Sequence, residues 1–528
     1  MPCSQNKIDS NVASTSYAEE ECLKQLPTTP TWNPLEPNSF SDFGGSIATV
    51  ARNPINQSRQ RKKGVVTDLD AAGGFNQDLT QDNLRDLLQG FMFADLRKKG
   101  EAKNPPGITT QTLSMTAATS RITRVAGAID FTTQFDVADL VKVDGFSDAA
   151  NNGLFKVSAV TATTLDLSDA DGTDTAATVI DEAATAVAFI VDVGVETGAG
   201  DLDVDDTGSF PALTSTVLDF TTLGLVIGEW VYLGGDVVAV TFGTAANSGY
   251  ARVRTIAANR LEFDKTETTF VTEANATLLV QMFTGQVLKN ESGSLIKRRT
   301  YQLERQLGAP DPLLPAQIQS EYVIGAVPGE LTINVSTADK ITLDLSFLGS
   351  DHETRSGVTG VKTGLRPALA EADAFNTSSD FSRIKLAVHT DADAVADALF
   401  AFVTDLTLTI NNNLSGNKAI GVLGNFDVTA GIFAVGGGLT AYFSDVAAIQ
   451  TVRDNADVTL DAHIAKNNAG ITFDVPLLTL GDARANVEQD QPITLPITNE
   501  AADGSKIDPN LNHTLLFVFF DFLPSVAE

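Results

Sequence analysis

Residues 149–168 read AANNGLFKVSAVTATTLDLS, and residues 245–264 read AANSGYARVRTIAANRLEFD. Each stretch carries an Asn-Gly or Ser-Gly pair followed by two segments in which apolar and polar residues alternate. Alternation with a period of two predicts β-strands with one buried face. The glycine predicts a hairpin-type turn, because glycine reaches positive φ without a Cβ clash. The two stretches therefore predict a repeated all-β unit.

The repeat extends toward the N-terminus of both stretches. Ile129–Thr133 matches Leu218–Thr222, and Phe135–Gly145 matches Leu225–Gly235 with the acids Asp139 and Glu229 at the same position. The segment opens after the chain breaker Asn104–Gly107 and is rich in Thr, Ala, Val, Asp and Gly. We interpret it as an inserted domain of two all-β modules, residues 108–192 and 193–285.

The two flanks of this insert follow one pattern of elements. In the first flank, strand 40–50, a loop and the alternating segment 64–79 precede a helix that Thr80 can cap, with Leu84, Leu87, Leu88 and Phe91 as its apolar stripe. In the second flank, strand 402–410, a loop and segment 431–443 precede a helix that Ser444 can cap, with Val446, Ile449 and Val452 on one face. Further alternating strands follow each helix.

The expected fold is therefore mainly β. It consists of two β-sandwich or barrel domains, each with a flanking α-helix, and the inserted two-module domain. The expected domain limits are an N-terminal arm at 1–37, a discontinuous first domain at 38–107 and 286–350, modules at 108–192 and 193–285, and a second domain at 366–528.

The charge of the chain is strongly negative. The 528 residues carry a formal net charge of -31, divided as -1 over residues 1–107, -16 over 108–285 and -14 over 286–528. Affinity for nucleic acid comes mostly from basic groups that neutralise phosphates, so general nucleic-acid binding is excluded. Cys3 and Cys22 are the only cysteines, which excludes a disulfide framework and a Cys-based zinc site. No apolar run or N-terminal signal predicts membrane insertion or export.

The sequence contains no catalytic, cofactor-binding or metal-binding motif that we can assign, and no enzyme activity is expected. One stretch, Asp201–Gly208, resembles the start of a calcium loop, but Asp206 stands where glycine is needed and Ala212 where glutamate is needed. We favour a solvated acidic turn. The basic clusters Arg59–Lys63 and Arg97–Lys99 indicate a solvated loop or a surface that docks on acidic neighbours, rather than a nucleic-acid patch, which would need interleaved aromatic residues.

Several segments, in order along the chain, resemble the major tail tube proteins of long, flexible-tailed (siphovirus-type) bacteriophages. The likeness covers nearly all of residues 12–109 and 286–528. The segments that carry it are Tyr17–Glu20, Leu26–Leu35, Arg59–Lys63, Gly64–Phe93, Tyr301–Arg305, Leu406–Asn411, Leu439–Phe443 and Gln491–Ile497. The paired modules are similar to β-domains that are added to phage tail proteins.

The resemblance implies a structural virion protein whose domains close into rings around a β-barrel channel. Stacked rings would form the tail tube, through which the genome is ejected, with DNA as non-specific cargo in the lumen. Two tube domains per chain imply a homotrimeric ring with pseudo-sixfold symmetry, whereas one would imply six chains. Implied partners are further copies of the chain, the tape measure, the tail tip and the tail terminator. Assembly is expected in the host cytoplasm, and the insert is expected on the outer surface.

Two other classes of protein remain open from the sequence. An acidic extracellular adhesin or surface-layer protein would share the Thr- and Ala-rich β-modules, although it would normally carry an export signal. A carbohydrate-active enzyme could use paired carboxylates. Aromatic residues make up only 7% of the chain, and no aromatic-lined site supports the enzyme.

Overall fold

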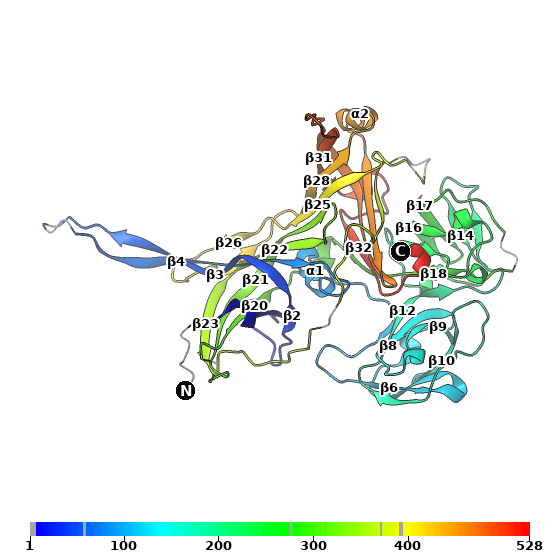
Figure 1. Ribbon diagram of the computed structural model, residues 1–528, viewed down its shortest axis with the longest axis horizontal. Coiled ribbons are helices and arrows are strands. Elements are labelled where there is room, and N and C mark those ends of the chain that lie inside the picture. Colours follow the sequence, from blue (N-terminus) through cyan, green and yellow to red (C-terminus); the bar gives the residue numbers. More distant parts are fainter. Residues whose placement is uncertain are drawn as a thin grey trace. The chain divides into compact units, whose positions relative to one another are not determined.

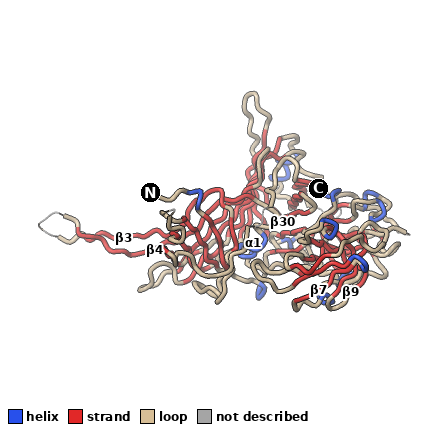
Figure 2. The backbone as a smooth tube through the Cα atoms, turned by 60° about the horizontal axis from the view of Figure 1, so that its bottom comes forward, coloured by secondary structure: helices blue, strands red, loops and turns tan. Residues whose placement is uncertain are grey.

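The computed structural model describes residues 7–55, 57, 60–274, 277–311, 313–369, 372–389, 394–395 and 397–528. Cys3 and Arg59 lie outside these residues. Strands dominate the described chain (Figure 2), which confirms the mainly β prediction. Its two α-helices are α1 (Arg85–Met92) and α2 (Ala447–Arg453).

The chain forms two compact units. Unit 1 comprises the residues up to Ala94, Gly293–Ala374 and Leu406–Gly437, and unit 2 comprises Asp95–Ser292, Phe375–Asp405 and Gly438–Glu528. The limits of the units fall inside two strands, β25 (Val403–Asn411) and β28 (Ala434–Tyr442). The domain limits expected from the sequence stay predictions.

Six strands form the first strand set, and neighbouring strands pair in the order β1-β20-β21-β22-β4-β3. Two short strands add to it: β2 (Asn33–Leu35) pairs with β1, and β23 (Asp351–Gly357) pairs with β21. The bounds of the six are β1 Ser14–Glu19, β20 Tyr301–Gly308, β21 Ile318–Ser336, β22 Thr342–Gly349, β4 Lys62–Asp78 and β3 Pro37–Arg52.

The second strand set has the order β24-β29-β30-β31-β28-β25. Here β32 (Leu516–Phe520) pairs with β30 as β23 pairs with β21, and β19 (Gln286–Lys289) pairs with β32. The remaining bounds are β24 Phe381–Val388, β29 Val458–Lys466, β30 Ala469–Asp482 and β31 Thr494–Ala502. A small hairpin, β26 (Ser415–Asn417) with β27 (Asp427–Thr429), lies between β25 and β28. The two sets thus have the same order of strands, including the extra strand on the third member.

Each set places a helix after its fifth strand in that order. In α1, Leu87, Leu88 and Phe91 are buried as the stripe predicts, and Phe91 packs edge-on against Phe347 with 5.2 Å between ring centroids. Gly90 lets α1 lie close to Tyr301 of β20, because a Cβ at this position would be 2.6 Å from the Tyr301 hydroxyl.

The predicted caps differ from those that form. The first turn of α1 begins at Leu84, without a side-chain cap from Thr80. At α2 the Asp445 carboxylate, rather than Ser444, accepts a hydrogen bond from the Ala447 amide at 3.0 Å. Ala448 is the buried residue of α2, and Val446 at its start is exposed, so the predicted apolar face is only partly covered.

The insert contains a second sheet, whose strands pair in the order β11-β6-β7-β10-β9-β8-β12-β18-β15-β16-β17-β14-β13, with β5 also on β12. The bounds up to β10 are β5 Glu101–Ala102, β6 Thr112–Thr116, β7 Arg121–Ala126, β8 Asp139–Asp144, β9 Gly153–Val160 and β10 Thr164–Asp169. The others are β11 Glu182–Thr185, β12 Phe189–Glu196, β13 Asp203–Asp205, β14 Ala212–Thr214, β15 Trp230–Leu233, β16 Gly249–Ala257, β17 Arg260–Thr266 and β18 Gln281–Phe283.

The strand β12 belongs to both halves of this sheet. It pairs with β8 along most of its length and, from Gly194 onward, with β18 as well. Gly194 has φ of 150°, and a Cβ there would lie 2.1 Å from the Met282 carbonyl oxygen, so glycine is required where the second partner joins. The expected limit between the modules, at residues 192 and 193, falls inside this strand.

Each half of the insert buries its own apolar core, one containing Phe131 and Phe135 and the other Phe220 and Phe263. A third cluster joins side chains of the insert, among them Trp230 and Tyr250, to Leu516, Val518 and Phe520 of β32. Within unit 2, the second half of the insert therefore packs directly on the second strand set.

Candidate functional site

The two halves of the insert make the same contacts at corresponding positions. Asp130 accepts a hydrogen bond from the Thr132 amide at 3.0 Å, and Asp219 accepts one from the Thr221 amide at 2.9 Å. Asn151 and Asn247, which are both fully buried, also correspond. Each amide group donates to a main-chain carbonyl (of Ile180 or Val271) and to a glutamate (Glu182 or Glu273), and accepts from the amide of Ile180 or Val271. The glycines Gly153 and Gly249 have the positive φ predicted for them.

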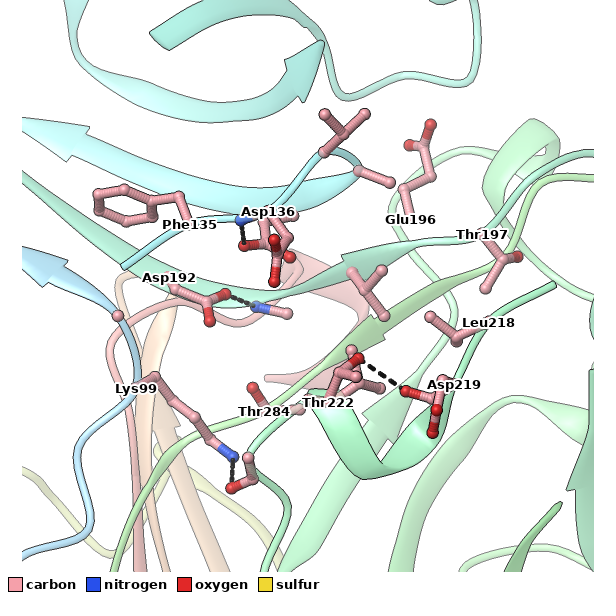
Figure 3. Close-up of a pocket in the computed structure, with 18 of the residues that line it drawn as sticks. Lys99, Phe135, Asp136, Asp192, Glu196, Thr197, Leu218, Asp219, Thr222 and Thr284 are labelled. Carbon is pink, nitrogen blue, oxygen red and sulfur yellow. Dashed lines mark hydrogen bonds between the residues drawn. The ribbon is translucent and has the colours of Figure 1, made fainter. Parts of the chain in front are cut away.

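A pocket of about 600 Å³ lies where the two halves meet (Figure 3). Its walls come from the turn after Asp130, the corresponding turn after Asp219, and β12. Asp136, Asp139 and Asp192 line it. Lys99, on the opposite side, donates to the Gly224 carbonyl at 2.9 Å and pairs with the buried Glu229 at 3.3 Å, so its charge is already matched.

Two carboxyl groups of the pocket, those of Asp139 and Asp192, have pKa values shifted toward the neutral form. Burial raises the pKa of Asp139 to about 8, and the nearby charge of Asp192 adds to the effect. Burial likewise raises the pKa of Asp192 to about 7. In the described part of the chain, no three His, Cys, Asp or Glu side chains form a group that could hold a metal ion.

The stretch that resembled a calcium loop uses its acids for local hydrogen bonds. Asp201 accepts hydrogen bonds from the Ser215 hydroxyl at 2.6 Å and the Val217 amide at 3.0 Å. Asp205 accepts from Thr207 and pairs with Arg260, and these hydrogen bonds lower its pKa to about 2. The carboxylates point to separate partners instead of converging on one ion.

A buried network of charges fixes the second half of the insert to the second strand set. Arg252 on β16 is fully buried and pairs with Asp264 at 2.5 Å and with Asp474 of β30 at 2.9 Å. Trp230 donates its indole N–H to the same Asp474 at 3.0 Å. The Tyr250 ring stacks on His463 of β29, with centroids 4.1 Å apart. Burial alone would raise the pKa of Asp264, but the guanidinium of Arg252 holds it below its usual value.

The hairpin of β3 and β4 projects from the rest of unit 1 (Figure 1). Residues 43–67, which we call the arm, contain Arg52, Arg59, Arg61, Lys62 and Lys63 and no acidic residue. Its described apolar side chains are exposed, among them Ile47 at 57% and Val50 at 56%. In the described part of the chain, β4 is the only strand that pairs with β3, so no strand is hydrogen-bonded to the outer edge of β3. The basic cluster Arg59–Lys63 could be predicted from the sequence, and the absence of acidic residues from 43–67 is the sequence signal for the whole arm.

The corresponding strand of the second set, β25, has a partner on its outer edge. The part of β25 in unit 1 lies antiparallel to β21, with Thr409 bonded to Thr332 at 3.0 Å. Asn412, next after β25, donates its backbone amide to the Gly329 carbonyl at 2.9 Å. Its side-chain amide donates to the carbonyls of Pro328 and of Phe91 at the end of α1, both at 3.0 Å. This junction extends the sheet of unit 1 and satisfies a carbonyl at the end of its helix.

A model of the family described as phage tail tube protein matches residues 215–501. The match covers more than half of the chain and runs from the second half of the insert through β31. None of the curated proteins matches the chain. No helix in the described residues is long and apolar enough to cross a membrane.

Proposed function

Because the chain belongs to the phage tail tube protein family and is thus a structural protein of a phage tail, we propose that it builds the tube of a siphovirus-type tail. Copies close into rings, the rings stack, and the channel so formed carries the genome into the host. The protein would assemble in the host cytoplasm and remain in the virion.

The two strand sets are two tube domains in this proposal. The observation that supports it best is their common strand order, with the helix and the extra strand in the same places. A second likeness is the Val-Pro pair in the third strand of each set, Val327-Pro328 in β21 and Val475-Pro476 in β30. In both strands the partner changes near this pair: β23 pairs with β21 up to Ile324 and β22 pairs from Val327 onward, whereas β32 pairs with β30 up to Asp474 and β31 pairs from Leu477 onward. Three chains would therefore supply six similar domains to a ring.

The insert faces outward in this ring, since a channel that passes DNA leaves no room for two β-modules. The packing of β32 against the insert supports this placement, because it covers one face of the second strand set with protein. The matching contacts of the two modules also support their origin as an internal repeat. The remaining partners, namely the tape measure, the tail tip and the tail terminator, would meet the tube at its lumen and ends.

DNA is a cargo rather than a ligand in this function. The segment 286–528, which contains the second strand set, has a net charge of -14. Acidic groups on a channel wall repel phosphates, so the genome slides without being held.

Negative-stain microscopy of the purified protein tests the proposal. Rings or tubes with an axial hole and three chains per ring are expected. A protein that stays monomeric at high concentration and binds glycans would instead indicate the adhesin class, and a ring of six chains would refute the three-chain arrangement.

A further inference from the structure

The two modules of the insert, module 1 (residues 108–192) and module 2 (residues 193–285), carry different charges at one pair of corresponding positions. We propose that the pocket between them binds the primary ammonium group of a small linear amine. The ammonium lies on Asp139 and Asp192 of module 1 as the Lys99 ammonium lies on Glu229 of module 2. The bound amine is a free small molecule, and its binding does not depend on assembly of a tube.

Asp139 and Glu229 occupy the same position in the repeat and have the same local geometry. Each accepts a hydrogen bond from the amide three residues earlier, Asp139 from Asp136 at 2.6 Å and Glu229 from Val226 at 2.9 Å. Asp139 is 9% exposed and Glu229 is fully buried. The two carboxyl groups therefore enter the interior of the insert from equivalent turns.

Module 2 shows which group completes this position. Lys99 Nζ lies 3.3 Å from Glu229 Oε1 and donates to the Gly224 carbonyl at 2.9 Å. The Lys99 side chain is almost fully buried, so an alkylammonium is enclosed against the carboxylate. In module 1 the carbonyl that corresponds to Gly224 is that of Gln134, and Gly100 lies so close to it that there is no room for a Cβ. The chain therefore supplies its own ammonium to module 2 and places a glycine against module 1.

Module 1 has a second acid where module 2 has a neutral residue. Strand pairing identifies Thr284 as the counterpart of Asp192. The residues that precede these two pair with Tyr232 and Lys142 respectively, and Tyr232 matches Lys142 in the repeat. Module 2 thus combines one carboxylate with one ammonium, whereas module 1 combines two carboxyl groups.

The charges of these two carboxyl groups are not matched. Among the described residues, no lysine, arginine or histidine forms an ion pair with Asp139 or Asp192, and both lysines that line the pocket pair with glutamates. Burial and the charges of Asp192 and Asp136 raise the pKa of Asp139 to about 8. Burial raises the pKa of Asp192 to about 7, with the charge of Asp136 raising it and that of Lys99 lowering it. At neutral pH a proton therefore takes the place of the missing cation on Asp139.

The walls of the pocket suit an alkyl chain behind the ammonium. The pocket has a volume of about 600 Å³, and its apolar lining includes Val137, Val195 and Leu218. Figure 3 shows Asp192 on one side of the pocket and Leu218 on the other. A metal ion is disfavoured, because no three suitable side chains are grouped to hold one in the part of the chain that the structure describes. A linear amine satisfies the acids and also removes apolar wall from water.

Calorimetric titration of the full-length chain with n-butylamine, at constant ionic strength, tests the site. Saturable binding is expected. Asp139→Asn and Asp192→Asn should each weaken it by about tenfold or more, because each removes a hydrogen bond between charged groups. Asp166→Asn, which removes an acid from the partly exposed pair with Arg121 in module 1, is the matched control and should leave the affinity unchanged. Absence of saturable binding, or equal weakening by all three substitutions, would overturn the proposal.

The pH dependence gives a readout that general attraction to an acidic protein does not. Because Asp139 is protonated at neutral pH, the ammonium must displace its proton. The affinity should therefore rise from about pH 6 to about pH 9, a range in which n-butylamine stays cationic. Heats measured in two buffers of different ionisation enthalpy should show proton release by the wild type and less by Asp139→Asn. An affinity that is constant over this range would refute the role of Asp139.

Competing ligands distinguish the ammonium from other occupants. The quaternary trimethyl derivative of butylamine cannot donate hydrogen bonds and should bind at least about tenfold more weakly than n-butylamine. Equal binding of the two, or displacement of n-butylamine by calcium chloride at matched ionic strength, would contradict an ammonium site. Much tighter binding of acetyl-lysine amide would overturn the assignment to a free amine in favour of a lysine side chain of a partner. The melting temperature of each variant shows whether it is folded.

Discussion

Removal of the Arg252 guanidinium should destabilise unit 2 strongly. Arg252→Met keeps most of the side-chain volume but removes both nitrogens that pair with Asp264 and the one that pairs with Asp474. Asp264 and Asp474 are almost fully buried, so neither can regain water in exchange. Breaking a buried ion pair from one side costs about 3–5 kcal/mol. We expect Arg252→Met to lower the free energy of unfolding by an amount in that range at neutral pH. Asp474 is not left without a partner, because it keeps the hydrogen bond from Trp230.

The loss of stability caused by Arg252→Met should depend on pH. In the wild type the pair holds the pKa of Asp264 low, so its stabilisation is present above the unfolded-chain pKa of about 3.9 and disappears as the pH falls through the folded value. In the variant, burial without the Arg252 guanidinium raises the pKa of the Asp264 carboxyl, and protonation of that carboxyl relieves the cost. The difference in stability between wild type and variant should therefore shrink between about pH 7 and about pH 4.

Denaturation followed by tryptophan fluorescence is the assay, because the chain has one tryptophan in each unit. Trp230 contacts the network in unit 2, and Trp32 reports on unit 1. The control is Arg121→Met, which removes a partly exposed pair with Asp166 and should change little. If Arg252→Met unfolds at the same denaturant concentration as Arg121→Met, the network does not hold the insert on β30.

Other substitutions test separate parts of the two units. Asn151→Ala and Asn247→Ala each remove three hydrogen bonds at corresponding buried positions, so each should cost about 2–3 kcal/mol in thermal unfolding, and a large inequality would contradict the equivalence of the modules. The pKa of Asp139 is raised to about 8, so the folded state keeps a proton that the unfolded state releases and wild-type stability falls from about pH 4 to about pH 8. Asp139→Asn should reduce this decline, which melting temperatures at about pH 5 and about pH 9 would show. Trp32→Ala, which removes a buried ring packed on Tyr322, should cost about 3–5 kcal/mol in unit 1 and leave the unfolding reported by Trp230 unchanged.

Strands and helices with one buried face could be predicted from the sequence. The alternation within residues 149–168 corresponds to β9 and β10, and the stripe at Leu84–Phe91 corresponds to α1. These patterns are local, because burial of one face imposes a period on consecutive residues. The repeated Asp-Phe-Thr-Thr segments that begin at Asp130 and Asp219 are also local features. Each forms a turn in which the aspartate accepts a hydrogen bond from an amide two residues later.

Features that depend on distant residues could not be predicted in this way. Arg252 and Asp474 lie 222 positions apart, and neither belongs to a motif. The sharing of β12 between the modules depends on which strands approach it, and Gly194 alone did not indicate a second partner. At α2, Ser444 and Asp445 are both good capping residues, and only the position of the first helical turn decides between them.

The course of β12 also determines how the insert transmits force. The strand β12 connects module 1 (residues 108–192) to module 2 (residues 193–285) without a flexible linker. After module 2, β18 is followed within three residues by β19, which pairs with β32. Arg252 adds a second link from module 2 to β30. A pull on module 1 (residues 108–192) is therefore transmitted through hydrogen-bonded strands to the second strand set. Any object that attaches to module 1 is thereby coupled mechanically to the strands at the other end of unit 2.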